Sequence, residues 1–129
     1  MRALLDTRVF LWLQTEPERV GRALGVLADE RTELFFSAAS AWEIAIKYGL
    51  GRLPLPEPPQ NYVPSRIQAI GATTLAVDHI DAVGVTNLPN HHRDPFDRML
   101  VSQARRHAFT LVTGDDALLR YDVDHLRVP

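Results

Sequence analysis

The sequence predicts an α/β protein in which helices cover both faces of a parallel sheet. Short apolar runs of strand length, at residues 3–5, 34–36, 73–77 and 109–113, alternate with longer segments. In those longer segments the apolar residues recur at helical spacing. Strands that alternate with helices form parallel sheets, because each crossover helix returns the chain to the same end of the sheet. Acidic residues also follow several of the strands, and this matters for function.

The totals favour one domain spanning residues 1–129, with an apolar fraction of 46% that is enough for a core. No run of about 20 apolar residues is present, so we expect no membrane span. Asp6 interrupts the first apolar run, and we expect no secretory leader. The sequence has no cysteine, which excludes thiolate sites and fits a cytoplasmic protein. A net charge of -2 gives no general attraction for nucleic acid.

The first strand, 3–5, ends at Asp6, where a short helix begins. One face of that helix carries four apolar residues: Val9, Phe10, Trp12 and Leu13. A second helix opens at Glu16-Pro17-Glu18, since proline suits a first helical turn. Its inner face is also apolar: Val20, Leu24, Leu27 and Ala28. These elements predict a strand followed by two helices that pack on it.

The second strand, 34–36, leads into a helix expected from about Ser40 to Tyr48. This helix is apolar almost all round, which is typical of a well-buried element. Glu43 is the acid within it. Ser40 and Glu43 have the spacing of a capping box, and Glu43 and Lys47 have that of an i,i+4 ion pair. Either arrangement would explain Glu43 without any catalytic role.

The proline-rich stretch 52–64 is interpreted as a rigid connection within the domain. A helix that contains Ile67 and Ile70 follows and closes at Gly71, before the β-branched strand 73–77. Asp78 and Asp81 then have the spacing of a helix cap. We therefore assign both acids to capping.

The stretch Asp94-Pro95 begins an amphipathic helix, because Asp suits the cap and Pro the first helical position. Its buried face consists of residues at helical spacing: Phe96, Met99, Leu100, Gln103, Ala104 and His107. The strand 109–113 is followed by Gly114-Asp115-Asp116 and a short helix over 117–120. The tail 122–129 is expected to add one short edge strand.

Four acids come together in this scheme. Asp6, Glu43 and Asp115 lie just past strand ends or in the helix that follows, and Asp97 opens the helix before the last of these strands. Each has an ordinary explanation as a cap or turn residue. In a parallel sheet, however, ligands bind in the crevice beyond the carboxyl ends of the strands. One crevice can therefore gather all four.

Crowded carboxylates repel one another, and a divalent cation removes that repulsion. Oxygen ligands without cysteine, and without histidines at metal-ligand spacing, favour Mg²⁺ or Mn²⁺ over Zn²⁺. The chemistry that such a cation supports best is phosphodiester hydrolysis. Phosphate-binding glycine loops, a cysteine nucleophile and a Gly-x-Ser-x-Gly elbow are all absent from the sequence. We interpret His91 and His92 as solvent-facing residues or phosphate contacts.

Five stretches together resemble the PIN-domain ribonucleases, and within them the VapC-type toxins of bacterial toxin–antitoxin pairs. They are Leu4-Leu5-Asp6-Thr7, the segment 37–47, Gly51-Arg52-Leu53-Pro54-Leu55, the segment 92–100 and Leu111-Val112-Thr113-Gly114-Asp115. The resemblance implies a three-layer α/β/α sandwich with a central, mainly parallel sheet of four to five short strands. It also implies a Mg²⁺- or Mn²⁺-dependent endoribonuclease, a VapB-like antitoxin partner and a homodimer.

The resemblance transfers the catalytic acids of the family to Asp6, Glu43, Asp97 and Asp115, with the metal chiefly at Asp6 and Asp97. Thr113 matches the hydroxyl residue that precedes the last acid. Asp94 and Asp116 remain alternative acids or supporting groups. Arg8, Arg93 and Arg98 lie beside the acids in the sequence. They are candidate contacts to RNA phosphate, with salt bridges to the acids as the alternative.

Two other functions compete with this one. In the first, the acids are caps, and the protein is a catalytically inactive domain that acts through a complex with an antitoxin and DNA. In the second, the same site is a metal-dependent DNA nuclease. The sequence does not separate RNA from DNA as substrate, because contacts to the 2′-hydroxyl leave no motif here.

Overall fold

A computed structural model describes all residues of the chain, 1–129. Its centre is a five-stranded sheet in the order β3-β2-β1-β4-β5, and every neighbouring pair is parallel. The strands are β1 (Arg2–Leu5), β2 (Glu33–Ser37), β3 (Thr73–Leu75), β4 (Thr110–Thr113) and β5 (His125–Arg127). The predicted α/β architecture is confirmed, including the edge strand expected in the tail.

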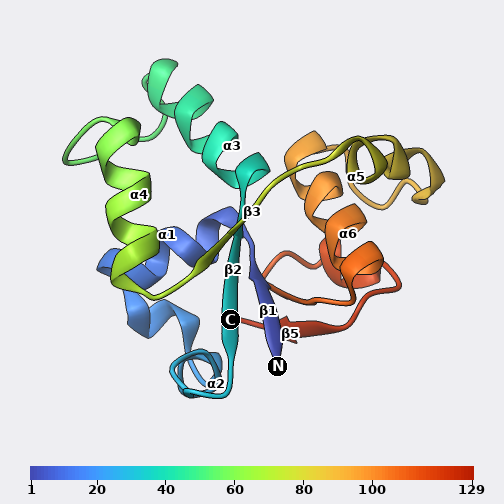
Figure 1. Cartoon of the computed structure of the whole chain (residues 1–129), viewed down its shortest axis with the longest axis horizontal. Coiled ribbons are helices and arrows are strands. Elements are labelled where there is room, and N and C mark those ends of the chain that lie inside the picture. Colours follow the sequence, from blue (N-terminus) through green and yellow to red (C-terminus); the bar gives the residue numbers. More distant parts are fainter.

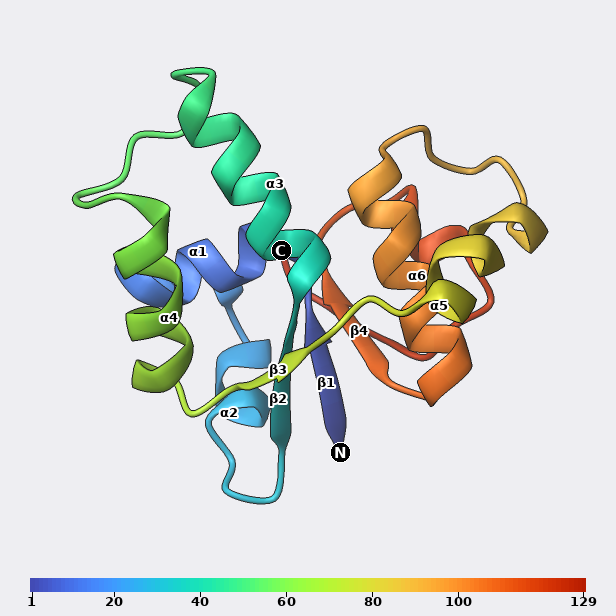
Figure 2. The ribbon, with the colours of Figure 1, turned by 45° about the horizontal axis from the view of Figure 1, so that its top comes forward.

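Helices cover both faces of the sheet (Figure 1). One side carries α1 (Thr7–Thr15), η1 (Pro17–Val20), α2 (Ala23–Leu27), α3 (Ala38–Gly49) and α4 (Pro59–Ala69). The other side carries α5 (His79–Gly84), η2 (Val85–Asn87), α6 (Pro95–His107) and η3 (Leu118–Arg120). In Figure 2, α3 rises directly from the upper end of β2. The helix that carries Glu43 therefore begins at the carboxyl edge of the sheet.

The two faces of the sheet belong to two separate apolar cores. Side chains of successive strand residues point to opposite faces. Ala3 and Leu5 therefore join the core under α1, α3 and α4, whereas Leu4 joins the core under α6. In β4, Val112 and Leu111 divide in the same way. Burial on both faces explains why these strands are continuous apolar runs with no polar alternation.

Two predicted boundaries are wrong. The cap of α3 is Ser37, whose hydroxyl accepts from the backbone N–H of Ala39 at 3.0 Å, and not Ser40. Ser40 lies inside the helix, and its buried hydroxyl has no hydrogen-bond partner. The proline-rich connection is also shorter than expected, since α4 begins at Pro59 and contains Pro64. Pro64 is tolerated on the exposed side of that helix.

Other local expectations agree with the structure. Asp78 and Asp81 form a complete capping box at α5, and Asp94 caps α6. The second predicted helix is divided into the short elements η1 and α2. No helix has the length and apolar character needed to cross a membrane.

Candidate active site

A pocket of about 720 Å³ opens at the carboxyl ends of β1 and β4. Four predicted acids line it: Asp6, Glu43, Asp97 and Asp115. They come from the N-cap of α1, the middle of α3, the first turn of α6 and the loop after β4. The structure therefore brings together four side chains from segments that are far apart in the sequence.

Asp6 is both a helix cap and a buried group at the floor of the pocket. Its Oδ1 accepts from the backbone N–H of Val9 at 2.8 Å, and its Oδ2 accepts from the hydroxyl of Thr113 at 2.5 Å. The residue is 6% exposed. Burial raises the pKa of Asp6, although the hydrogen bonds from Thr113 and Val9 oppose that rise. The capping explanation is thus correct and does not remove Asp6 from the pocket.

Glu43 is buried in the wall of the pocket and paired on both oxygens. Oε1 accepts from the hydroxyl of Thr7 at 2.6 Å, and Oε2 accepts from Nζ of Lys47 at 2.5 Å. The predicted i,i+4 pair with Lys47 is confirmed, and the predicted capping box with Ser40 is replaced by the bond to Thr7. Glu43 is therefore fixed in orientation by a neighbouring helix as well as by its own.

Asp97, in the first turn of α6, also has a raised pKa. Burial, together with the carboxylates of Asp94, Glu43 and Asp6, raises its pKa from the ordinary 3.8 to about 7, and the charge of His92 opposes part of that rise. Asp94 caps α6 by accepting from the backbone N–H of Asp97 at 3.1 Å. This cap aims the first turn of α6 at the pocket.

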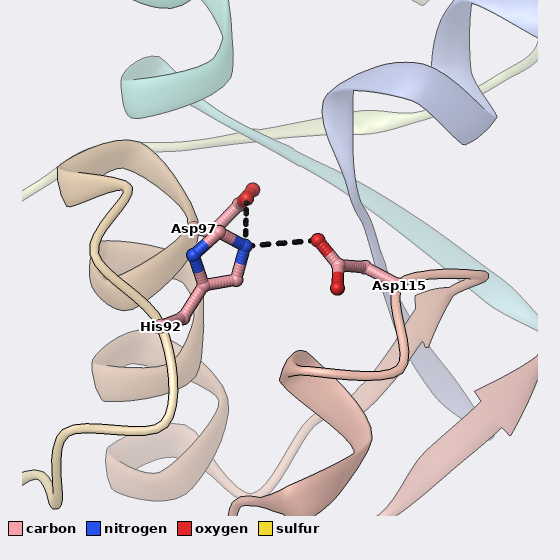
Figure 3. A group of neighbouring side chains, drawn as sticks. All are labelled: His92, Asp97 and Asp115. Atoms are coloured by element: carbon pink, nitrogen blue, oxygen red, sulfur yellow. Dashed lines mark hydrogen bonds and ion pairs between the residues drawn. The ribbon is translucent and has the colours of Figure 1, made fainter.

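Asp115 meets Asp97 across the ring of His92 (Figure 3). Nε2 of His92 lies 2.8 Å from Oδ2 of Asp115 and 3.1 Å from Oδ2 of Asp97. Burial raises the pKa of Asp115, but hydrogen bonds from His92 and from the N–H of Ala117 outweigh it, so the pKa lies below its ordinary value. One ligand atom from each of the three residues lies within 4.8 Å of the others. This spacing suits a cation.

Of the three residues expected to support the acids, two lie at the pocket and one lies outside it. Thr113 is fully buried and accepts from the N–H of Asp115 at 3.0 Å while its own hydroxyl donates to Asp6. Asp94 lines the pocket as the cap of α6. Asp116 is exposed, forms an ion pair with Arg127 at 3.0 Å and does not line the pocket.

The candidate phosphate contacts also differ in placement. Arg8 lines the pocket, and Arg93 is exposed without lining it. Arg98 turns away: its guanidinium donates to the carbonyl oxygens of Pro89 and Val85 at 3.0 Å each. We therefore assign Arg98 to holding the loop before α6 in place.

Sequence reasoning missed three residues of this pocket. The sequence favours a solvent-facing His92 or a phosphate contact, yet its ring lies between two acids and is 19% exposed. Lys47 and Arg52 add positive charge to the wall beside Arg8. The position of His92, five residues before an acid at a helix start, was the available signal. No local pattern indicated Arg52, which only the fold brings near Asp6.

The donor set fits a hard divalent cation. Carboxylate oxygens are the most numerous ligand atoms of the pocket. Burial is the largest cause of the raised pKa of both Asp6 and Asp97, and for Asp97 the neighbouring carboxylates add to it. Oδ2 of Asp97 faces His92, whereas its Oδ1 accepts no hydrogen bond from the protein. Mg²⁺ and Mn²⁺ bind such oxygens in preference to softer ligands. Asp6 and Asp97, which the sequence resemblance marks as metal ligands, both line this pocket and could hold such an ion.

Fold and pocket together define an α/β protein with an acidic site suited to a divalent cation. The model of the PIN domain family matches residues 3–124, so the chain belongs to the PIN domain family.

Two curated relatives come from Mycobacterium tuberculosis. The chain is 48% identical over 62 residues to Ribonuclease VapC16, a match that spans 48% of this chain and 44% of that relative. It is 28% identical over 116 residues to Ribonuclease VapC22, and this match covers 89% of this chain and 88% of that relative. The first match thus covers less than half of the relative's length.

Solved structures share the fold over the whole chain. VapBC2 from Rickettsia felis, bound to a DNA fragment from its promoter, superposes with a TM-score of 0.73 at 17% identity, covering 100% of both chains. FitAcB from Neisseria gonorrhoeae gives 0.64 at 20% identity, covering 97% of this chain and 96% of the other. At these identities the likeness establishes the fold.

Proposed function

We propose that this chain is a single PIN domain acting as a metal-dependent endoribonuclease, the toxin of a VapBC-type toxin–antitoxin pair. The observation that carries the proposal is the convergence of Asp6, Glu43, Asp97 and Asp115 in one pocket. Two relatives named ribonuclease VapC support the same activity. The expected cofactor is Mg²⁺ or Mn²⁺. The cytoplasmic location expected from the cysteine-free sequence stays a prediction.

The residues of the pocket have separate roles in the proposed reaction. A bound divalent cation supplies positive charge that polarises the scissile phosphate. Thr113 and Thr7 hold the carboxylates of Asp6 and Glu43 in fixed orientations, which is the preorganisation that electrostatic catalysis requires. Lys47 offsets the charge of Glu43 at 2.5 Å.

Basic side chains lie beside the acids and would contact the RNA backbone. Arg8, Lys47 and Arg52 line the same pocket as the carboxylates. Arginine binds phosphate through a planar fork of donors, so Arg8 and Arg52 would hold the phosphates that flank the scissile bond. This local charge explains how a chain with a net charge of -2 can bind a polyanion.

The partner that we propose is a VapB-like antitoxin. The structural neighbour from Rickettsia felis is named as the VapBC2 pair on promoter DNA. Co-expression of this chain with the product of the adjacent reading frame, followed by affinity purification, should recover a stoichiometric complex without ribonuclease activity. Recovery of the chain alone from that co-expression would oppose this part of the proposal.

We also propose a homodimer. Three exposed apolar residues lie four positions apart, Trp42 and Ile46 on α3 and Leu50 at its C-cap, and they are 64%, 36% and 62% exposed. Such a stripe is a surface that a second copy can bury. Sedimentation velocity should show a dimer for the wild type and a monomer for Leu50→Glu, whereas a monomeric wild type would contradict the assignment.

Cleavage of cellular RNA tests the enzymatic proposal. With Mg²⁺, the wild type should cut RNA internally, and Asp6→Asn or Asp115→Asn should lower the rate by at least about 100-fold, because even residues that only orient metal ligands cost about 10–100-fold. Asp116→Asn is the matched control, since Asp116 lies outside the pocket and should retain activity. Equal cleavage by wild type and Asp6→Asn would refute the proposal. Faster cleavage of DNA than of RNA would show that DNA is the substrate and that the protein is a DNA nuclease.

A further inference from the structure

The ring of His92 is held at both nitrogens. Nδ1 accepts a hydrogen bond from the backbone N–H of Asp94 at 3.1 Å. Nε2 faces the pocket, 2.8 Å from Oδ2 of Asp115 and 3.1 Å from Oδ2 of Asp97. The side chain is 19% exposed, so protein atoms surround most of the ring (Figure 3).

These contacts select one tautomer. A backbone N–H always donates, so Nδ1 of His92 must offer its lone pair to Asp94 and carries no proton. The proton of the neutral ring then lies on Nε2, which donates to the carboxylate of Asp115. The ring enters the acidic pocket as a hydrogen-bond donor.

This polarity is the reverse of that found for histidines that bind metals. A metal-binding histidine offers the lone pair of one nitrogen to the ion and donates the N–H of the other to a carbonyl or carboxylate. For His92 to bind an ion through Nε2, its proton would have to move to Nδ1, where it would face the N–H of Asp94. Although His92, Asp97 and Asp115 have the spacing of a metal site, the hydrogen bond from Asp94 opposes ligation by the histidine.

We propose that His92 is a positioning residue for the metal site and not one of its ligands. Its Nε2–H holds Asp115 beside Asp97 at a separation set by one ring, so both carboxylates are in place before the cation arrives. The free lone pair of the His92 ring is on Nδ1, which faces Asp94 and not the pocket. The ligands offered to the cation are therefore all oxygen atoms, which favours Mg²⁺ and Mn²⁺ over Zn²⁺. This inference rests on the metal site of the proposed function.

The loop that carries His92 is held in place by the side chain of Tyr121. The backbone N–H of His92 donates to the hydroxyl of Tyr121 at 3.1 Å, and the same hydroxyl accepts from Arg98 at 3.1 Å. Tyr121 is 3% exposed, in the core on the α6 side of the sheet. The ring is therefore fixed from the backbone side as well as at Nδ1.

The tautomer can be measured directly by nitrogen-15 NMR of histidine-labelled protein, with the His92 signals assigned by their loss in His92→Gln. We expect Nε2 protonated and Nδ1 unprotonated, both without metal and after Mg²⁺ is added. A proton on Nδ1 in either state would overturn the proposal, because Nε2 would then be free to bind the ion.

Three substitutions separate positioning from ligation. His92→Gln keeps an N–H near the place of Nε2, His92→Asn reaches only as far as Nδ1, and His92→Ala removes both groups. Calorimetric Mn²⁺ affinity should stay within about threefold for Gln and fall about tenfold or more for Asn and Ala, the range found for residues that orient metal ligands. His91→Gln, at the exposed neighbour, is the matched control and should bind as the wild type does.

Equal losses for Gln and Ala, or no loss for Ala, would contradict the positioning role. A nitrogen coupling to bound Mn²⁺ in pulsed electron paramagnetic resonance that disappears in His92→Gln would show a histidine ligand and overturn the proposal. None of these readouts involves RNA. If they come out as expected and the protein cleaves no RNA, the ribonuclease proposal fails and the assignment of His92 stands.

Discussion

The hydroxyl of Thr113 donates to Oδ2 of Asp6 at 2.5 Å, although the two residues are 107 positions apart in the chain. The same hydroxyl oxygen accepts from the N–H of Asp115 at 3.0 Å. One buried side chain thus connects the acid after β1 with the acid after β4. Because these strands are neighbours in the sheet, the contact follows from the strand order.

Thr113→Val should weaken Mg²⁺ and Mn²⁺ binding by about 10–100-fold, as for other residues that orient metal ligands. Valine has nearly the same shape but leaves Oδ2 of Asp6 without its donor and the N–H of Asp115 without its acceptor. Calorimetric titration measures the effect. Thr113→Ser keeps the hydroxyl and should bind within a few fold of the wild type. Wild-type affinity in the valine variant would show that the hydroxyl does not support the site.

Asp97 should make the metal-free protein less stable as the pH rises. Its pKa is about 7 in the folded state against 3.8 ordinarily, so between those values the folded protein keeps a proton that the unfolded chain has lost. The free energy of unfolding therefore falls from about pH 4 to about pH 7 through this group and levels off above.

Asp97→Asn removes this contribution and should stabilise the metal-free protein at pH 8 by about 1–3 kcal/mol, because each pKa unit corresponds to about 1.4 kcal/mol. Urea denaturation of both proteins in chelator at pH 5 and pH 8 gives the comparison. Excess Mg²⁺ should narrow the difference, since the cation stabilises only the wild type. An asparagine variant that is less stable at pH 8 would refute this account of the charge balance.

Arg8 and Arg98 should respond differently to alanine substitution. Arg8→Ala should reduce the slope of log affinity against log salt by about 1 for an RNA ligand, as for a lost phosphate contact. Arg98→Ala should leave that slope unchanged and destabilise the fold by about 1–3 kcal/mol, because it removes charged hydrogen bonds to the carbonyls of Pro89 and Val85. A lower salt slope in Arg98→Ala would restore Arg98 as an RNA contact.

Ala108 ends α6 in the left-handed conformation, with φ of 55°, where glycine has no steric penalty. The residue is exposed, so Ala108→Gly loses no packing. We expect the variant to gain about 0.5–1 kcal/mol in chemical denaturation. A loss of stability would mean that the helix end does not adopt this conformation in solution.

The fold and the gathering of four acids were predictable, because both follow from the order of elements. Runs such as 3–5 and 109–113 are apolar throughout since both faces are buried, and parallel strands place their carboxyl ends along one edge. Asp6 and Asp115 follow adjacent strands and had to lie close together. Glu43 and Asp97 were placed in the same crevice because their helices follow β2 and precede β4, and the resemblance then assigned all four acids to catalysis.

Local choices between equivalent residues were not predictable. Ser37 and Ser40 are both good caps, and the length of β2 decides between them. Pro64 suggested a break, yet α4 continues through it. The roles of His92 and Arg98 depend on how the loop before α6 folds back on Tyr121, a contact that spans 29 residues and leaves no local pattern.

The central claim is that carboxylates from separate segments hold one divalent cation. Anomalous scattering from a crystal soaked in Mn²⁺ tests it most directly. We predict one strong peak about 2.0–2.3 Å from a carboxylate oxygen of both Asp6 and Asp97, and more than about 3 Å from Nε2 of His92. The absence of a peak in this pocket at millimolar Mn²⁺, or a peak bound to His92 and not to Asp6, would contradict the account.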